Sequence, residues 1–270
     1  MENTHLTLTG RVALITGSSK GIGKAIAQSL AQEGADVVLT ARDPVVLEAT
    51  VQEFERLPGK AFAVAADATD PQSVQRVVGD AIQRFGRLDI LVNNVGGVNK
   101  ITKFYDLNRD DWISAFDLNV MTVVHFVQQA LPWLKKSKVG RIINIASISG
   151  VEPGLLIPHY CASKAAVINL SKHLANLLGS DGVLVNVICV GQVHSDGRDQ
   201  LAKQVAYEEE ISLINARIKI DAQGAARIPL GRIGQGDDVA GLVTFLASDK
   251  SAWITGSCFH VNGGKHRSAF

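Results

Sequence analysis

The chain has 270 residues, of which 46% are hydrophobic and 20% are charged, so it can form one large α/β domain or two small ones. A formal net charge of +1 gives no reason to expect nucleic acid or an anionic membrane as a partner. No apolar run reaches the roughly 18 residues of a membrane span, and the polar residues 1–10 lack the layout of a signal peptide. The 3 cysteines and 7 histidines have no metal-ligand spacing. We therefore expect a cytoplasmic protein with reduced thiols and no metal.

Short apolar runs alternate along the chain with segments of helical periodicity. The runs predict strands at residues 11–16, 37–40, 61–65, 88–93, 140–146, 183–189 and 258–261. The periodic segments predict helices at residues 24–33, from Pro44 onward, and at 71–85, 110–136, 158–179 and 237–247. This alternation predicts an α/β fold: one Rossmann-like, doubly wound parallel sheet of about seven strands with helices on both faces. We expect a single domain over residues 1–270.

Residues 191–234 interrupt this alternation, because they contain no clear strand. Within them, residues 207–220 have a helical pattern, with Ile211, Ile214 and Ile218 at spacings of three and four. The segment follows the carboxyl end of a strand, where ligands bind in open α/β sheets. We therefore predict a substrate-binding lid over residues 191–234. A helix packed permanently on the body is the alternative.

The first turn from strand to helix carries Gly17, Gly21 and Gly23. Glycine lets the backbone approach a ligand closely, and the following helix offers free N–H groups and a positive dipole to a pyrophosphate. The spacing differs from the usual dinucleotide fingerprint, but the location, after the first strand and before a helix, predicts a dinucleotide site.

The end of the second predicted strand bears on which dinucleotide binds. An acid there usually holds the ribose 2′-hydroxyl, whereas a 2′-phosphate needs cations. The chain has Ala41 at that position, followed by Arg42, and Lys20 brings a second cation from the glycine turn. These residues favour NADP(H) over NAD, although Asp43 follows directly and opposes that preference. The alternative is that Arg42 and Lys20 are solvated surface charges.

Tyr160 and Lys164 are four residues apart and therefore share one face of the predicted helix. A phenol with a pKa of about 10 is a poor proton-transfer group at neutral pH, and a neighbouring ammonium can lower that pKa. Ser147, at the end of the preceding strand, can hold a substrate oxygen. The pair alone also occurs by chance on helix surfaces, so the rest of the chain decides its meaning.

Over about residues 8–264 the chain resembles the short-chain dehydrogenase/reductase family, and within its main branch it looks like a 3-oxoacyl reductase. The resemblance rests on motifs that are weak singly and specific in this order and spacing. They are residues 16–23, Asp67, residues 93–96, Asn119, Ser147, residues 160–164, and the tail pieces 229–234, 247–249, 254–256 and 261–264.

The resemblance implies a role for each matching residue. Tyr160 is expected to be the acid/base, and Lys164 to lower the pKa of Tyr160 and bind the nicotinamide ribose. Ser147 is expected to orient the substrate oxygen, and Asn119 to hold a water that relays protons to Lys164. The residues expected to bind the cofactor are Gly17, Ser19, Lys20, Gly21, Ile22, Gly23, Arg42, Asp67, Ala68, Asn94, Gly96, Tyr160, Lys164, Gly191, Val193 and Ser195. The residues expected to bind substrate are Ser147, Ser149, His159 and Gln192. A histidine such as His159 more often caps or packs.

The chain departs from the family pattern at three places. Val95 replaces the usual alanine beside the cofactor, and Val190-Gly191 replaces the usual Pro-Gly. Because proline would fix φ, its loss predicts a more mobile start of the lid. Asp181 stands where a cation would help to bind an acidic acyl carrier protein, which weakens that substrate reading.

The sequence thus predicts an NADP(H)-dependent oxidoreductase that interconverts a ketone and a secondary alcohol on a moderately apolar small molecule. The alternatives are a 3-oxoacyl thioester reductase, a non-catalytic nucleotide-binding sensor or scaffold, and a lyase or epimerase that uses the same site. By resemblance we expect a homo-oligomer, a tetramer or a dimer. The substrate, the physiological direction and the stereospecificity stay open.

Overall fold

The structure, a computed structural model, describes residues 7–268, and within them seven parallel strands form one sheet in the order β3-β2-β1-β4-β5-β6-β7. The strands are β1 (Val12–Thr16), β2 (Asp36–Ala41), β3 (Ala61–Ala65), β4 (Ile90–Asn93), β5 (Arg141–Ser147), β6 (Leu184–Val190) and β7 (Cys258–Val261). Each predicted strand is present within two residues of its expected bounds. The predicted polar start overlaps residues 1–6, which lie outside the described residues.

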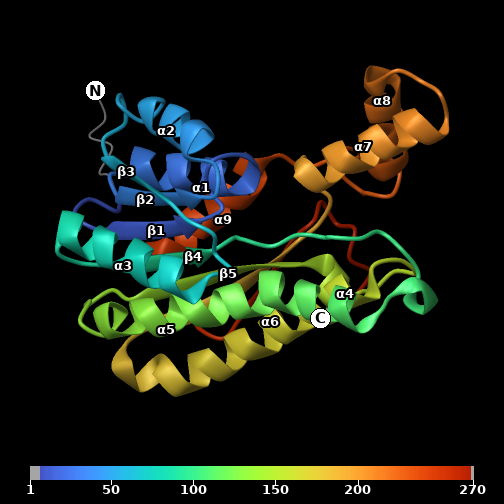
Figure 1. The fold of residues 1–270 in the computed structure, drawn as a ribbon. Coiled ribbons are helices and arrows are strands. Elements are labelled where there is room, and N and C mark those ends of the chain that lie inside the picture. Colours follow the sequence, from blue (N-terminus) through green and yellow to red (C-terminus); the bar gives the residue numbers. More distant parts are fainter. Residues whose placement is uncertain (1–6, 269–270) are drawn as a thin grey trace.

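Helices cover both faces of the sheet (Figure 1). They are α1 (Gly21–Gln32), α2 (Pro44–Gln52), α3 (Pro71–Phe85), α4 (Arg109–Phe116), α5 (Thr122–Leu134), α6 (Pro158–Leu178), α7 (Asp196–Glu208), α8 (Leu213–Ala225) and α9 (Gly236–Ala247). Successive side chains of a strand point to opposite faces, so Leu14 joins the core under α3, α5 and α6, while Ile15 joins the core under α1 and α9. This arrangement confirms the predicted fold class.

The helix predicted over residues 110–136 is interrupted. A capping box of Asn108 and Asp111 starts α4, but a π-helical turn, Asp117–Met121, separates α4 from α5. A π turn inserts one extra residue per turn and is frequent at functional sites. Hydrophobic periodicity continues through such a turn, which is why the pattern predicted one helix.

The helix predicted over residues 207–220 is wrong in its bounds. The chain forms two helices there, α7 and α8, which lie to one side of the sheet, apart from its helical layers (Figure 1). Ser212 ends the break by accepting a hydrogen bond from the Asn215 N–H, at 3.1 Å, and so caps α8. The isoleucine pattern misled because Ile214 and Ile218 are 69% and 63% exposed.

The segment that carries α7 and α8 is joined at its base. Val193 and Gly234 form a parallel bridge, the His194 N–H donates to the Gly234 carbonyl at 3.0 Å, and the Gly234 N–H donates to the Gln192 carbonyl at 2.9 Å. The Gly191 N–H donates to the carbonyl of Val261, in β7, at 2.9 Å. The backbone at Val190-Gly191, where the family usually has Pro-Gly, is therefore held by hydrogen bonds.

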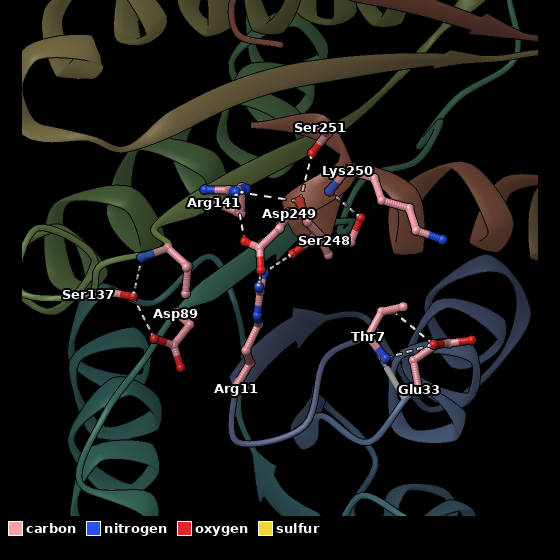
Figure 2. A network of polar contacts seen from close by, with 12 residues as sticks. Thr7, Arg11, Glu33, Asp89, Ser137, Arg141, Ser248, Asp249, Lys250 and Ser251 are labelled. Atoms are coloured by element: carbon pink, nitrogen blue, oxygen red, sulfur yellow. Dashed lines mark hydrogen bonds and ion pairs between the residues drawn. The ribbon is translucent and has the colours of Figure 1, made fainter. Parts of the chain in front are cut away.

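Polar contacts fix the amino-terminal edge of the sheet. Asp89 is fully buried just before β4 and accepts hydrogen bonds from the Val12 N–H at 2.9 Å and from Ser137 at 2.5 Å. Arg87 donates to both carboxylate oxygens of Asp89 at 2.8 Å. The carboxylate thus ties β4 to β1, and its bond to Ser137 ties it to the segment before β5 (Figure 2).

Two buried arginines complete this edge. Figure 2 shows Asp249 between Arg11, which precedes β1, and Arg141, the first residue of β5. Arg11 is 2.6 Å from the Asp249 carboxylate and donates to the Ala247 carbonyl at 2.6 Å. These contacts tie α9 to the edge of the sheet that lies opposite the carboxyl ends of the strands. No helix among residues 7–268 is long and apolar enough to cross a membrane.

Candidate active site

A cavity of about 900 Å³ opens at the carboxyl edge of the sheet, where the strand order reverses between β1 and β4. Such a switch point is where ligands bind in open α/β sheets. Every residue expected to bind the cofactor lines this cavity, and so does Ser147. The structure therefore brings the glycine turn, Arg42 and the Tyr160–Lys164 pair to one site.

Close backbone packing forms the glycine turn. Gly17 has a φ of 64°, in the left-handed region that favours glycine, and a Cβ on Gly23 would lie 2.3 Å from the Gly17 carbonyl oxygen. The Asn94 side chain donates to the carbonyls of Thr16 and Gly17, at 2.9 and 3.0 Å. These contacts aim the first N–H groups of α1 at the cavity, where they suit a pyrophosphate.

The end of β2 presents a cation to the cavity. Arg42 is exposed there, and the carboxylate of Asp43 accepts hydrogen bonds from the N–H groups of Val45 and Val46, at 2.9 and 3.1 Å. Asp43 therefore caps α2. In the sequence, the Asp43 carboxylate counted against a 2′-phosphate. In the structure this carboxylate is hydrogen-bonded to the backbone of α2, so Arg42 is the charged group that can meet the ligand.

Asp67, at the adenine end expected from the family pattern, is also held in place. Its carboxylate accepts hydrogen bonds from the Thr69 N–H at 2.9 Å and from the Thr69 hydroxyl at 2.8 Å. These bonds, with Arg42 nearby, hold the pKa of Asp67 below its ordinary value. The side chain is thus an ionised acceptor at the mouth of the cavity.

The start of α6 sets the positions of Tyr160 and Lys164. Ile157 precedes the helix with a φ of 60°, and its N–H donates to the Thr102 carbonyl at 3.0 Å. The hydroxyl of Tyr160 is hydrogen-bonded to Ser147, at the end of β5. The Lys164 ammonium donates to the carbonyl of Ile145 at 3.0 Å and is buried beneath the tyrosine. The three side chains therefore converge on the same end of the cavity.

Burial dominates the titration of this pair. It lowers the pKa of Lys164 to about 8, because the ammonium loses solvation. It also raises the pKa of Tyr160 above its ordinary value, and the hydrogen bond to Ser147 offsets only part of that rise. The expectation that Tyr160 has a lowered pKa is therefore not met in this structure. A protonated phenol is the form that donates a proton to a developing alkoxide.

Asn119 lies behind Lys164 in the π-helical turn and does not line the cavity. Its amide donates to the carbonyls of Gly97 and Ala115, at 3.0 and 2.9 Å, and its oxygen accepts from the Gly97 N–H at 3.0 Å. A Cβ on Gly96 would lie 2.7 Å from both the Asn119 oxygen and the Lys164 nitrogen. Through these contacts Asn119 holds the loop around Gly96 and Gly97 in place beside Lys164. Its expected water relay stays a prediction.

Three residues expected to bind substrate do not line the cavity: Ser149, His159 and Gln192. His159 is fully buried and packs edge-on against Trp112, with ring centres 6.3 Å apart, because it lies on a different helix face from Tyr160. The Ser149 N–H donates to the Ser147 hydroxyl at 3.1 Å, so Ser149 supports Ser147 through its backbone. His159 therefore packs inside the protein, as the alternative to a substrate-binding role predicted.

One wall of the cavity was missed in the sequence. Ile113, Ser114 and Leu118, from α4 and the π-helical turn, line it beside the loop that follows β4. The Asn99 side chain donates to the Ser114 hydroxyl at 2.6 Å and so fixes the loop after β4 to this wall. The sequence shows only an isoleucine in a helical segment, and its 40% exposure becomes visible in the structure. Many surface positions carry such a residue, so it does not identify a binding wall.

A parallel sheet with a glycine-rich first turn, and a serine, a tyrosine and a lysine at its switch point, defines a dinucleotide-dependent oxidoreductase. Residues 11–206 match the short chain dehydrogenase family. The 3-oxoacyl-(acyl-carrier-protein) reductase FabG of Staphylococcus aureus (strain Mu50) is 35% identical over 255 residues, which are 94% of this chain and 97% of that protein. The corresponding FabG of Thermotoga maritima is 34% identical, over 96% of this chain and 99% of that protein.

A solved structure is also similar. The L-sorbose reductase from Gluconobacter frateurii, complexed with NADPH and L-sorbose, has a TM-score of 0.92 and 30% identity, and the match covers 98% of this chain and 100% of that one. The chain belongs to the short-chain dehydrogenase family. This confirms the predicted family, its 3-oxoacyl-reductase-like character and the predicted oxidoreductase class.

Proposed function

We propose that the chain is an NADP(H)-dependent reductase of small-molecule ketones, in which Tyr160 supplies the proton. The observation that carries the proposal is the convergence of Ser147, Tyr160 and Lys164 on the cavity that the glycine turn and Arg42 also line. Seven other residues of the expected cofactor set, from three different strand ends, line the same space, which argues against a chance Tyr–Lys pair.

The residues fit NADP(H). The glycine turn and the start of α1 line the cavity, where they can meet a pyrophosphate, and Arg42 offers a guanidinium to a 2′-phosphate at the end of β2. Lys164, at the other end, is positioned to hold the nicotinamide ribose. When bound, the cofactor supplies the hydride. The related sorbose reductase is an NADPH complex, which supports this choice.

The chain's own groups account for the proton. Ser147 donates a hydrogen bond to the substrate carbonyl oxygen, and Tyr160 donates its phenolic proton to the same oxygen as negative charge develops there. The buried ammonium of Lys164 stabilises the phenolate that remains. In the oxidative direction Tyr160 takes the proton back from the alcohol.

The substrate is a small ketone, and a 3-oxoacyl thioester is the second candidate. FabG relatives at 35% identity favour the thioester. The surface behind α5 opposes it, because the Lys135 ammonium lies 2.7 Å from the Asp181 carboxylate, so this lysine is already paired and offers less charge to an acidic carrier protein. A free ketose, as in the sorbose reductase, needs no such surface.

The remaining predictions belong to this proposal. We propose that residues 191–234, with α7 and α8, form a substrate-binding lid within a single domain over residues 1–270. Val193 and Ser195 at the start of the lid line the cavity, which supports that role. A homo-oligomer and a cytoplasmic location stay predictions.

Steady-state turnover separates the candidates. Purified protein is assayed with NADPH and NADH against a panel of free ketones, ketoses and 3-oxoacyl thioesters. We expect consumption of NADPH with at least one free ketone. Turnover of thioesters alone would select the second candidate, and tight NADPH binding without any turnover would select the non-catalytic sensor.

A further inference from the structure

Two cysteine sulfurs lie in contact behind the catalytic pair. The Sγ atoms of Cys189, in β6, and Cys258, in β7, are 3.3 Å apart, and both cysteines are free. Cys189 is fully buried and lies close enough to Lys164 to influence its titration. Cys258 is exposed on the edge strand of the sheet. A cysteine on the exposed edge strand therefore contacts a buried cysteine close to Lys164.

Two imidazoles lie near Cys258, one from β7 itself and one from the segment after it. The rings of His260 and His266 stack with centres 4.4 Å apart, and His266 Nδ1 lies 3.4 Å from a carboxylate oxygen of Glu152. The His266 side chain is only 9% exposed, and its Nε2 has no partner among the described residues. His266 therefore lies close enough to Cys258 to influence its titration.

We propose that Cys258 is a peroxide-sensitive thiol and that Cys189 then closes a disulfide with it, which weakens the cofactor site at Gly191. The pKa of Cys258 is lowered to about 7, mainly by the hydrogen bond with Cys189 and further by His266, while burial opposes both. Because the thiolate is the nucleophile, this favours reaction at neutral pH.

The reaction balances with a hydroperoxide as the oxidant. The Cys258 thiolate attacks one peroxide oxygen, an S–O bond forms and the O–O bond breaks, and the departing oxygen takes a proton. This leaves Cys258 as a sulfenic acid. The sulfur of Cys189 then displaces that hydroxyl, which leaves as water with the proton of the Cys189 thiol. Two thiols are oxidised by two electrons, and hydrogen peroxide is reduced to two waters.

Closing the bond requires β7 to move. Cys189 is in register with His260, and Cys258 with Val187, so the two cysteines are diagonal neighbours on parallel strands. The sulfurs must approach from 3.3 Å to the disulfide length of about 2.05 Å. The edge strand β7 has 4 residues and, within residues 7–268, pairs with β6 alone, so it is the part that can shift.

The shift reaches the cofactor site through the end of β7. The Val261 carbonyl accepts the Gly191 N–H at 2.9 Å, and a Cβ on Gly191 would lie 2.6 Å from the Cβ of Asn262. Gly191 lines the cavity next to the residues expected to hold the nicotinamide. Because a misplacement of about 1 Å can cost about a hundredfold in rate, we expect oxidation to reduce turnover by roughly tenfold or more.

The test treats the full chain with hydrogen peroxide and counts thiols by alkylation and mass spectrometry. We expect the number of free thiols to fall from 3 to one, with a Cys189–Cys258 disulfide in the peptide map, and dithiothreitol to restore all of them. Cys258→Ser should resist the loss of NADPH-dependent turnover, whereas the matched variant Cys161→Ser should stay as sensitive as the wild type.

Three results with the wild type and Cys258→Ser would overturn the proposal, and a fourth comes from Cys189→Ser. The three are retention of all thiols after peroxide, a disulfide that joins two chains, and equal sensitivity of Cys258→Ser and the wild type. In Cys189→Ser, dimedone should label Cys258 as a sulfenic acid; no label would also count against it. The turnover readout rests on the proposed function, but the thiol count does not. A failure of the disulfide proposal can therefore be distinguished from a failure of the proposed function.

Discussion

The Lys164 ammonium lies 5.9 Å from the ring centre of Tyr160, one helical turn along α6, and donates to the carbonyl of Ile145 at 3.0 Å. The ammonium is thus held by the sheet under the phenol ring and makes no direct bond to the hydroxyl group. We propose that it acts on the proton of Tyr160 electrostatically, which requires the ammonium to keep its charge.

That condition predicts a pH dependence. Burial lowers the pKa of Lys164 to about 8, so the ammonium is charged below that pH and loses its charge above it. We expect kcat/KM for ketone reduction to fall as the pH rises through about 8. Lys164→Arg should move this fall to higher pH, because a guanidinium stays charged. A pH–rate profile that is flat from pH 7 to pH 10 would contradict the assigned role of Lys164.

Arg42→Asp should shift cofactor preference towards NADH. The change removes the guanidinium that faces the 2′-phosphate and adds a carboxylate that repels it. We expect the ratio of kcat/KM values for NADPH and NADH to fall by about tenfold or more, the scale of one charge-assisted hydrogen bond of ~1.5 kcal/mol or above. Arg56→Asp, at an exposed arginine away from the cavity, is the matched control. An unchanged ratio in Arg42→Asp would refute the charge argument.

Asp89→Asn should destabilise the fold without touching the site. The carboxylate is fully buried and accepts hydrogen bonds from Val12, Ser137 and Arg87. Since Arg87 is half-exposed, we expect a loss of about 2 kcal/mol in the free energy of unfolding, measured by urea denaturation. Glu48→Gln, at an exposed carboxylate, should leave that free energy unchanged. Equal stability of the two variants would show that the amino-edge network contributes little.

Arg198→Ala should raise the KM for the ketone and leave NADPH affinity near that of the wild type. Arg198 is 13% exposed and joins α7 to α8, with bonds to the Asp221 carboxylate at 2.6 Å and to the Ile220 carbonyl at 2.9 Å. Its loss removes this link between the two helices of the proposed lid. Lys203→Ala, on the exposed face of α7, is the control. If both variants keep the wild-type KM, α7 and α8 do not form a lid.

The central strands of the sheet were predictable because they are buried on both faces. All 5 residues of β1 are buried, and such a run is an unambiguous strand signal when turn residues bound it. The break at Asp117–Met121 was not predictable, because a π turn keeps the apolar spacing of the helices on either side. The split of the lid into α7 and α8 was missed for the opposite reason: its apolar spacing includes residues that face solvent.

The candidate site was predictable where backbone position alone decides. Gly17, Arg42, Ser147 and Tyr160 follow strand ends or begin a helix, and parallel strands end at one edge. Side-chain direction was not readable from the sequence. His159 neighbours Tyr160 in the chain, but its ring packs on Trp112 inside the protein. The cap made by Asp43 likewise depends on a rotamer that the sequence does not specify.

The most direct test of the central claim is the single-turnover rate of NADPH oxidation by Tyr160→Phe with a ketone that the wild type reduces. Phenylalanine keeps the ring but removes the proton that the carbonyl oxygen must receive. We expect the rate to fall by about 10²–10⁴-fold, the usual contribution of general acid catalysis, with NADPH affinity within a few-fold of the wild type. Tyr105→Phe, at a tyrosine that is 92% exposed, should keep full activity. A Tyr160→Phe rate close to that of the wild type would contradict the assignment of Tyr160 as the proton donor.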